Sequence, residues 1–288
     1  MTARSKLPPK VVRFYGNVDF ALDTIAHRQI TLVHVSKLND PFDPYFFFET
    51  DFGGNYDKLL EHVRKKHPQD VAGFSKAVTA ESWGQSVDNV QRDFKALWNG
   101  IYVLSTSAPR DSSHPKDNLY LWGHYGNGHR GVAVEFDTQQ TTSIMIDDHH
   151  RQKGELLTAE DVWIRVDYEH RLAPITLEQF FQFCKNSYEQ TGRRTSLHDY
   201  YDKIAKTKAL AWKTENEWRL LWQNDETRLK FHRTAINEAA ITAVYIGQNT
   251  ATGAAEDIVF ETRRQFPAAQ IYKARKRHGE FALDFERL

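Results

Sequence analysis

The chain has 288 residues, and its 38 lysines and arginines balance 38 aspartates and glutamates to a formal net charge of zero. This balance excludes a net electrostatic field that would draw the whole molecule to nucleic acid or to an anionic membrane. It does not exclude a local basic patch. Cys184 is the only cysteine, so no intramolecular disulfide can form. No apolar run approaches the ~18 residues of a spanning helix, and residues 1–30 lack the apolar core of a secretory signal. We therefore expect a cytoplasmic protein with no membrane role.

Hydrophobic periodicity and β-branched runs predict an alternation of strands and helices. In the first half we expect a strand at 11–16, a helix at 19–29 with Asp19 as a possible cap, a strand at 30–35, a turn at 39–44, helices at 56–66 and 86–98, and strands at 100–107 and 131–137. In the second half we expect helices at about 176–190 and 197–210, strands at 217–222, 228–233 and 241–247, a helix at about 252–265, and strands at 270–274 and 280–285.

Several of these strands follow one another without an intervening helix, which favours mixed or antiparallel sheets. The sequence contains no internal repeat, low-complexity tract or linker that would separate two domains. The predicted fold is therefore α+β, with residues 1–288 forming a single compact domain in which helices flank the sheets.

The stretch "LWGHYGNGHRG" precedes the strand at 131–137 and supplies Trp122, His124, Tyr125 and His129. Its glycines free the chain to adopt positive φ angles and let a ligand approach the backbone. A metal pair is disfavoured, because the two histidines lack helical spacing and have no cysteine or acidic cluster nearby. Hydrogen bonds that pin a loop and contacts to a ligand both remain open.

The stretch "KALAWKTENEWRLLW" brings two carboxylates and a guanidinium together. If 215–222 is extended, the period of two places Glu215, Glu217 and Arg219 on one face and the tryptophans on the other. Arg219 would then hold one carboxylate ionised while the other orients a hydroxyl or stabilises a cation. Glycosyl transfer needs such a pair, because its transition state carries oxocarbenium charge. A solvent-exposed ladder of Glu and Arg is the alternative.

Other catalytic signatures are missing. The sequence has no G-x-x-x-x-G-K-[ST], no G-x-G-x-x-G, no G-x-S-x-G and no H-E-x-x-H pattern. Cys184 has the spacing of a small apolar residue in a helix. The basic runs at 64–67 and 273–278 are typical of solvated faces, although the second could contact phosphate.

Four motifs stand in order along the chain: an aromatic strand, N-D-P-F at 39–42, W-x-H-Y-x-x-x-H-x-G at 122–131, and K-x-x-x-W-x-x-E-x-E-W-R at 208–219. Together they resemble the prokaryotic family called domain of unknown function 2971, over about residues 12–285. The resemblance implies no settled biochemistry. Families of this kind often sit in defence against phage or in other conflict systems, and that setting is an expectation here.

A weaker resemblance points to ADP-ribosyltransferases. "FYGN" stands at the place of their first motif, "LSTS" at 104–107 is similar to their serine element, and residues 215–217 read as E-x-E. Tyr15 stands where the usual histidine would be, and period two puts Arg13 on the same face. The resemblance implies an ADP-ribosyltransferase-like fold with NAD as a substrate and no certain cofactor.

Three functions follow as hypotheses. The first is a ribosyl-transferring enzyme or NAD glycohydrolase acting on a nucleotide. The second is a non-enzymatic module that senses a ligand or a protein partner, and the third is a metal-dependent nucleic-acid enzyme using His124 and His129. We expect Glu217, Glu215 and His124 to be catalytic. We expect ligand contacts from Tyr15, Arg13, Asn39, Asp40, Ser105, Trp122, Tyr125, His129, Lys208 and Arg219, and no bound metal.

All three hypotheses share one spatial prediction. The loop with Tyr125 and the acidic segment with Glu217 should line one cavity, because their apolar faces share a core while their polar side chains are costly to bury unpaired. Lys208 and the turn that contains Asp40 would close it.

Overall fold

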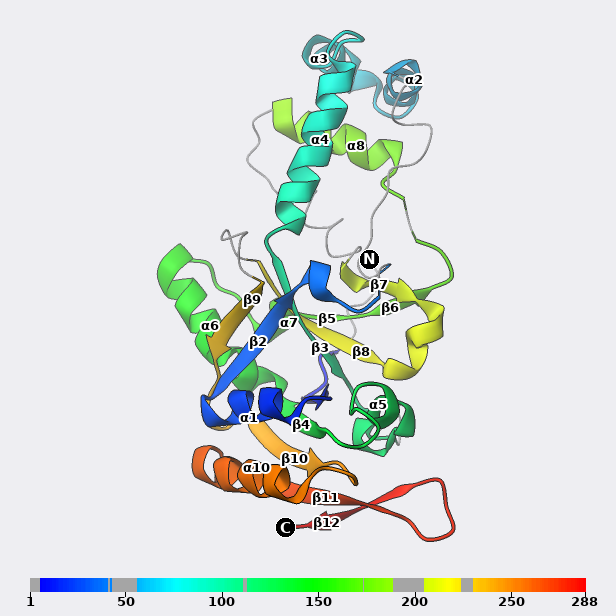
Figure 1. Cartoon of the computed structure of the whole chain (residues 1–288). Helices are drawn as coiled ribbons and strands as arrows, with labels where there is room; N and C mark the ends of the chain where they lie inside the picture. Colours follow the sequence, from blue (N-terminus) through cyan, green and yellow to red (C-terminus); the bar gives the residue numbers. More distant parts are fainter. Residues whose placement is uncertain are drawn as a thin grey trace.

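A mixed sheet of ten strands organises the chain, and a separate group of helices lies at one end of it (Figure 1). The computed structural model describes residues 6–40, 42, 56–110, 113–172, 174–188, 205–223 and 230–288. The strands are β1 (Lys10–Tyr15), β2 (Gln29–His34), β3 (Ile101–Ser107), β4 (Val132–Asp137), β5 (Trp163–Arg165), β6 (Asp167–Glu169), β7 (Thr207–Ala209), β8 (Glu217–Gln223), β9 (Phe231–Ala235), β10 (Ile241–Ile246), β11 (Gln270–Lys276) and β12 (Leu283–Arg287).

The α-helices are α1 (Val18–Ala26), α2 (Tyr56–Lys66), α3 (Val71–Ala77), α4 (Trp83–Trp98), α5 (Leu119–His124), α6 (Thr138–Lys153), α7 (Ala159–Val162), α8 (Leu177–Tyr188) and α10 (Thr252–Gln265). Short 3₁₀ turns are η1 (Val35–Lys37), η2 (Pro68–Asp70), η3 (Pro115–Asp117) and η4 (Leu210–Glu215). No helix of the described part is both long and apolar enough to cross a membrane.

The main sheet has the order β12-β11-β10-β4-β1-β3-β2-β9, and β8 joins it through β3 and carries β5. Its ladders are antiparallel except for the parallel pair β10–β11. Strands β6 and β7 form a second, parallel pair. The α+β class with mixed sheets and flanking helices is therefore confirmed.

Alternation along the strands gives the sheet two different faces. In β4, Val132, Val134 and Phe136 enter the largest core cluster, which helices α1, α6 and α10 cover through residues such as Ile25. Ala133 points to the opposite face and joins a smaller cluster. Strand β8 follows the same rule, so Glu217 and Arg219 share the face opposite its tryptophans, as the period of two predicts.

Strands β1 and β3 diverge soon after they meet. Their only paired residues in the described chain are Val12 and Ser107. On the same edge of β3, the pairing with β2 stops at Val103. The edge of β3 from Leu104 to Thr106 therefore has no strand partner there, and the sheet opens beside it. This opening forms the floor of the cavity described below.

The helical group at the top of Figure 1 is built from two distant parts of the chain. Helices α2, α3 and α4 come between β2 and β3, and α8 comes between β6 and β7. They share a hydrophobic cluster of their own that includes Leu59, Phe74, Trp83, Phe180 and Phe181. Two excursions of the chain from the sheet, one with α2, α3 and α4 and the other with α8, thus share one hydrophobic core away from the sheet.

Several elements differ from the prediction. Helix α6 was not predicted, because its threonines have modest helix propensity. Asp137 caps it by accepting from the backbone amides of Gln139 and Gln140, and Thr141 and Thr142 return their hydroxyls to the preceding turn.

In the segment 197–210, predicted as a helix, residues 205–206 are helical, but 207–209 form a strand and a 3₁₀ turn begins at Leu210; residues 197–204 lie outside the described part. The N-cap of α1 is Asn17 instead of Asp19, because the Asn17 side chain accepts from the Asp19 amide. The turn at 39–44 is described only in part, and there Asp40 accepts from the Phe42 amide.

Candidate functional site

A buried lysine joins the two carboxylates of the E-x-E motif. Lys208 Nζ lies 2.7 Å from Glu215 Oε2 and 2.9 Å from Glu217 Oε2, and all three side chains are at most 5% exposed. Lys208 comes from β7, which is held in place by its pairing with β6. Because both carboxylates contact one ammonium group, they lie close together despite occupying different elements.

Glu215 does not lie on the strand, which corrects the prediction that 215–222 is extended. It ends η4, and Asn216 then adopts the left-handed conformation (φ 45°, ψ 53°) before β8 begins at Glu217. Asn216 is held there by hydrogen bonds from its side-chain nitrogen to the carbonyl oxygens of Ala108 and Pro109. The turn, instead of strand alternation, brings the Glu215 carboxylate beside that of Glu217.

Arg219 completes the ion-pair network. Its Nε donates to Glu217 Oε1 over 2.8 Å, and its Nη2 lies 3.2 Å from Glu217 Oε2. Its Nη1 donates to the carbonyl oxygen of Ala205 over 2.8 Å. Arg219 is fully buried, so this charge is held entirely by protein groups. A buried arginine and lysine on one carboxylate fix its position and its negative charge.

Two tyrosines contact the residues of the acidic pair, one at a carboxylate and one at a backbone amide. The Tyr125 hydroxyl donates to Glu215 Oε1 over 2.5 Å, and the Asn39 side chain also approaches this hydroxyl. The Tyr168 hydroxyl accepts from the backbone amide of Glu217 over 2.8 Å. Burial, followed by the nearby Glu215 carboxylate, raises the pKa of Tyr125 above its ordinary value. Tyr125 therefore stays a proton donor to Glu215 at neutral pH.

The two carboxylates have pKa values that move in opposite directions. Burial raises the pKa of Glu215, and the opposing effect of Lys208 does not offset it. Burial also acts on Glu217, but Arg219 and Lys208 outweigh it and lower the pKa of Glu217 to about 2. Environments that separate two neighbouring carboxyl groups in this way produce one fixed charge and one proton carrier.

A cavity of about 330 Å³ opens at this network. It lies where β1 and β3 diverge, and its wall includes both glutamates. Its lining residues are Val12, Arg13, Phe14, Val33, Lys37, Leu38, Asn39, Ser105, Thr106, Ser107, Tyr125, Lys208, Glu215 and Glu217. The volume falls in the lower part of the range for small-molecule sites.

The cavity brings together seven of the residues proposed from the sequence: Arg13, Asn39, Ser105, Tyr125, Lys208, Glu215 and Glu217. Arg219 lies directly behind Glu217 and reaches the cavity only through it. The Arg13 guanidinium lies 5.2 Å from the centre of the Tyr15 ring, which confirms that these two residues share a face of β1. Asp40 is buried and its carboxylate holds the local turn.

Tyr15 and Trp122 lie elsewhere, which corrects their expected contact with a ligand. Tyr15 is buried in the main core, where its hydroxyl accepts from Thr24. Trp122 is 0% exposed, packs edge-on against Phe14, and donates its indole N–H to the carbonyl oxygen of Lys116. Neither ring presents a face to the cavity, because each is enclosed by its own core cluster.

The two histidines of the same stretch do not form a pair. His124 is exposed and stacks on Tyr120, with its other neighbours being Tyr125 and Trp212. His129 has a positive φ of 66° and stacks on Trp122. Burial lowers the pKa of His129, and its Nδ1 is buried without a hydrogen-bond partner in the described structure. Neither histidine lines the cavity, so the expected catalytic role of His124 has no geometric support.

Two contributors were not proposed from the sequence. Lys37 places a second lysine in the cavity wall, and Tyr168 orients the start of β8. Lys37 lies in a 3₁₀ turn that carried no sequence signal. The position of Tyr168 follows from the β6–β7 pairing across about 40 residues, a distance that local patterns cannot detect.

These features define the chain as an α+β protein with a small cavity walled by a buried pair of carboxylates. The model of the family described as "Protein of unknown function (DUF2971)" matches residues 121–220, and over this segment the chain is similar to that family. The matched segment contains the whole of the W-x-H-Y motif and of the E-x-E-W-R motif, whereas the N-D-P-F turn precedes it. No curated protein and no solved structure matches the chain. The likeness to ADP-ribosyltransferases therefore stays a prediction.

Proposed function

We propose that the cavity binds a nucleotide through its ribosyl portion and that the protein cleaves or transfers at the glycosidic carbon, with NAD as the first substrate to test. One observation carries this proposal. Lys208 holds two carboxylates within 3 Å at the cavity wall, and their pKa values are displaced in opposite directions. Glycosyl transfer uses a fixed negative charge and a proton carrier side by side.

In this proposal Glu217 provides the fixed charge. It stays ionised because Arg219 and Lys208 stabilise the carboxylate, and it faces the positive charge that develops at C1′ as the bond to nicotinamide breaks. The bonding electron pair leaves with the nicotinamide nitrogen, which becomes neutral. No proton has to be supplied to this leaving group.

Glu215 then acts as the general base. It takes a proton from water, or from an acceptor hydroxyl, while the oxygen bonds to C1′. With water, the products are ADP-ribose, nicotinamide and a proton that Glu215 passes to solvent. The Tyr125 hydroxyl orients Glu215, and Lys37, Asn39 and Ser105 line the cavity and would bind ribose or phosphate oxygens.

The test follows nicotinamide release by NMR when the purified chain is incubated with NAD. We expect turnover by the wild-type chain and a rate about 10²- to 10⁴-fold lower for Glu215→Gln, because the substitution removes the base. NAD affinity, measured by calorimetry, should change far less. Glu286→Gln, at an exposed carboxylate remote from the cavity, is the matched control.

The same experiment separates the ligand-sensing alternative. A specific observation favours that function, since both carboxylate oxygens of Glu217 already contact a buried cation. Binding of NAD or of another nucleotide from a panel, with no bond cleavage in the presence of candidate acceptors, would assign a sensor. Absence of both binding and turnover across that panel would overturn the nucleotide proposal altogether.

A further inference from the structure

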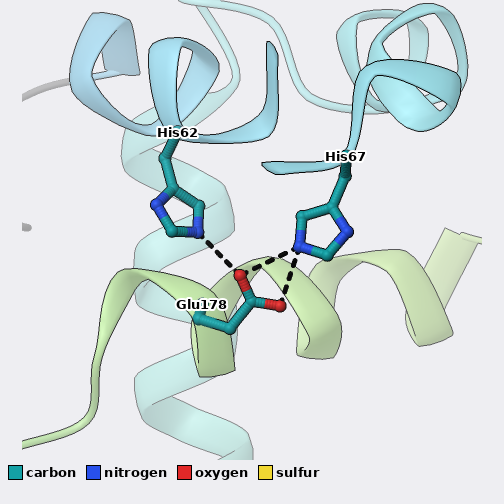
Figure 2. Close-up of side chains that lie close together, drawn as sticks. All are labelled: His62, His67 and Glu178. Carbon is teal, nitrogen blue, oxygen red and sulfur yellow. Dashed lines mark hydrogen bonds and ion pairs between the residues drawn. The ribbon is translucent and has the colours of Figure 1, made fainter. Parts of the chain in front are cut away.

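Two histidines and a glutamate converge in the helical group, far from the cavity (Figure 2). His62 Nε2 lies 2.7 Å from Glu178 Oε2, and His67 Nε2 lies 2.8 Å from Glu178 Oε1. One potential ligand atom from each residue lies within 4.8 Å of the other two. His62 comes from α2, His67 precedes η2, and Glu178 comes from α8, so the cluster joins both excursions of the chain.

Neighbouring side chains orient two of the three residues, His67 and Glu178. The His67 ring stacks on the buried Phe181 with 4.6 Å between ring centres. Gln182 donates to Glu178 Oε1 over 2.8 Å, from one turn further along α8. Figure 2 shows both imidazoles turned with Nε2 toward the carboxylate. Neighbours that orient ligand side chains in this way are typical of metal sites.

The donor set matches zinc. Zinc accepts imidazole nitrogen and carboxylate oxygen, and two histidines with one glutamate form a known set of three protein ligands that leaves a position for water. The ligand side chains are 23%, 21% and 41% exposed for His62, His67 and Glu178, so an ion can enter from solvent.

We propose that His62, His67 and Glu178 bind one zinc ion, with water as the fourth ligand, and that the ion fastens the two excursions of the helical group together. In the zinc complex each imidazole binds the metal through the lone pair of Nε2 and carries its proton on Nδ1. Ligand atoms around tetrahedral zinc lie ~3.3 Å apart, so the 2.7–2.9 Å contacts must widen by about half an ångström. Side-chain rotation at these partly exposed positions supplies that movement.

The experiment titrates zinc sulfate into the chelator-treated full-length chain by calorimetry. We expect one tight site per chain in the wild type, and at least a 100-fold weaker affinity for His67→Ala and for Glu178→Gln. The glutamine variant keeps the size and the hydrogen-bonding capacity of the side chain. It therefore separates zinc ligation by the carboxylate from a hydrogen bond that only joins the helices. His149→Ala removes a comparable histidine paired with Glu155 and serves as the matched control.

X-ray absorption of the zinc-loaded protein should show nitrogen and oxygen ligands with two imidazoles. Circular dichroism of each variant confirms that the helices remain folded. Two results would overturn the proposal: wild-type protein that takes up no zinc, or zinc that binds Glu178→Gln and His67→Ala as tightly as the wild type. The titration is independent of the cavity and can be repeated on Glu215→Gln with the same expected outcome.

Discussion

Lys208 is the residue on which the acidic pair depends. It is 4% exposed, it contacts both carboxylates, and it lies 5.3 Å from the centre of the Trp212 ring. A buried charge is tolerated only when it is paired and hydrogen-bonded. Removing the ammonium group would leave Glu217 with Arg219 alone, and it would place Glu215 beside a like charge.

Lys208→Met should therefore destabilise the protein by about 3–5 kcal/mol at pH 7, the range for breaking a buried ion pair. Without the lysine, the pKa of Glu215 rises further above its unfolded value. A group whose pKa is raised in the folded state makes the protein less stable as pH rises. The destabilisation caused by Lys208→Met should therefore be smaller at pH 5 than at pH 7. Urea unfolding at both pH values measures this difference.

Lys116→Met is the control for that substitution. Lys116 forms a partly exposed pair with Asp117, so the loss should stay at or below about 1 kcal/mol and should not shrink at pH 5. Equal losses of stability for the two variants would mean that the ion pairs of Lys208 contribute no more to stability than the surface pair of Lys116.

At the residue scale, the sequence predicted which residues of the acidic segment lie together better than it predicted their backbone geometry. Alternation in β8 correctly placed Glu217 and Arg219 on one face, because strand period is a local property. It misplaced Glu215, since the positive φ of Asn216 is fixed by contacts to Ala108 and Pro109 from another strand end. Tyr15 and Trp122 were assigned to a ligand because aromatic residues suit cores and binding sites equally well.

At the element scale, the glycine-rich stretch has a specific packing role. Gly131 immediately precedes β4, beside the end of β1, and it lies against the backbone of Tyr15 and Gly16. A Cβ added at residue 131 would overlap the Tyr15 carbonyl oxygen. Backbone cannot move aside as a flexible side chain can, so only glycine fits there.

Gly131→Ala should destabilise the protein by about 3 kcal/mol or more, at or above the upper end of typical overpacking costs, because two strands must separate. Gly253→Ala is the matched control, since a Cβ at this position in α10 meets nothing within 4 Å. It should leave stability unchanged or raise it by up to about 1 kcal/mol. Thermal unfolding of both variants is the measurement, and a Gly131→Ala protein as stable as the wild type would contradict the packing argument.

Sequence patterns predicted elements well where an amphipathic period was strong, as in α10 and β4. They failed where side chains supply the helix signal instead: α6 depends on the Asp137 cap and on threonine hydroxyls that bond back to the preceding turn. The cluster of His62, His67 and Glu178 could not be predicted from sequence patterns either. His67 and Glu178 are 111 residues apart, and the run that contains His67 was interpreted as a solvated basic face.

At the scale of the whole molecule, a net charge of zero conceals strongly organised charges. One buried carboxylate, Glu135 on β4, bonds to side chains on two neighbouring strands and on the segment beside η3. It accepts from Lys10 on β1 over 2.7 Å, from Thr242 on β10 over 2.6 Å, and contacts His114 beside η3 at 2.8 Å and Tyr245 at 3.2 Å. Burial raises its pKa, but hydrogen bonds from His114, Lys10 and Thr242 outweigh burial and lower the pKa to about 2.

This shift predicts how stability depends on pH. The unfolded chain titrates Glu135 near ~4.3, so the stabilisation is complete above that pH and is lost as pH falls toward 2. Lowering the pKa of Glu135 from its unfolded value to about 2 corresponds to about 3 kcal/mol. Glu135→Gln should therefore lose up to ~3 kcal/mol at pH 7 relative to wild type, and the difference should shrink as pH is lowered from 5 to 3.

Urea unfolding at pH 7, 5, 4 and 3 tests this expectation, with Glu286→Gln as the control. Glu286 pairs with Arg275 at the surface, so its replacement should cost at most about 1 kcal/mol at every pH. Since Glu217 also has its pKa lowered, to about 2, wild-type and Glu135→Gln proteins share the remaining acid sensitivity and only their difference reports Glu135. A difference that stays constant from pH 7 to pH 3 would show that packing, instead of the charge on Glu135, accounts for the loss.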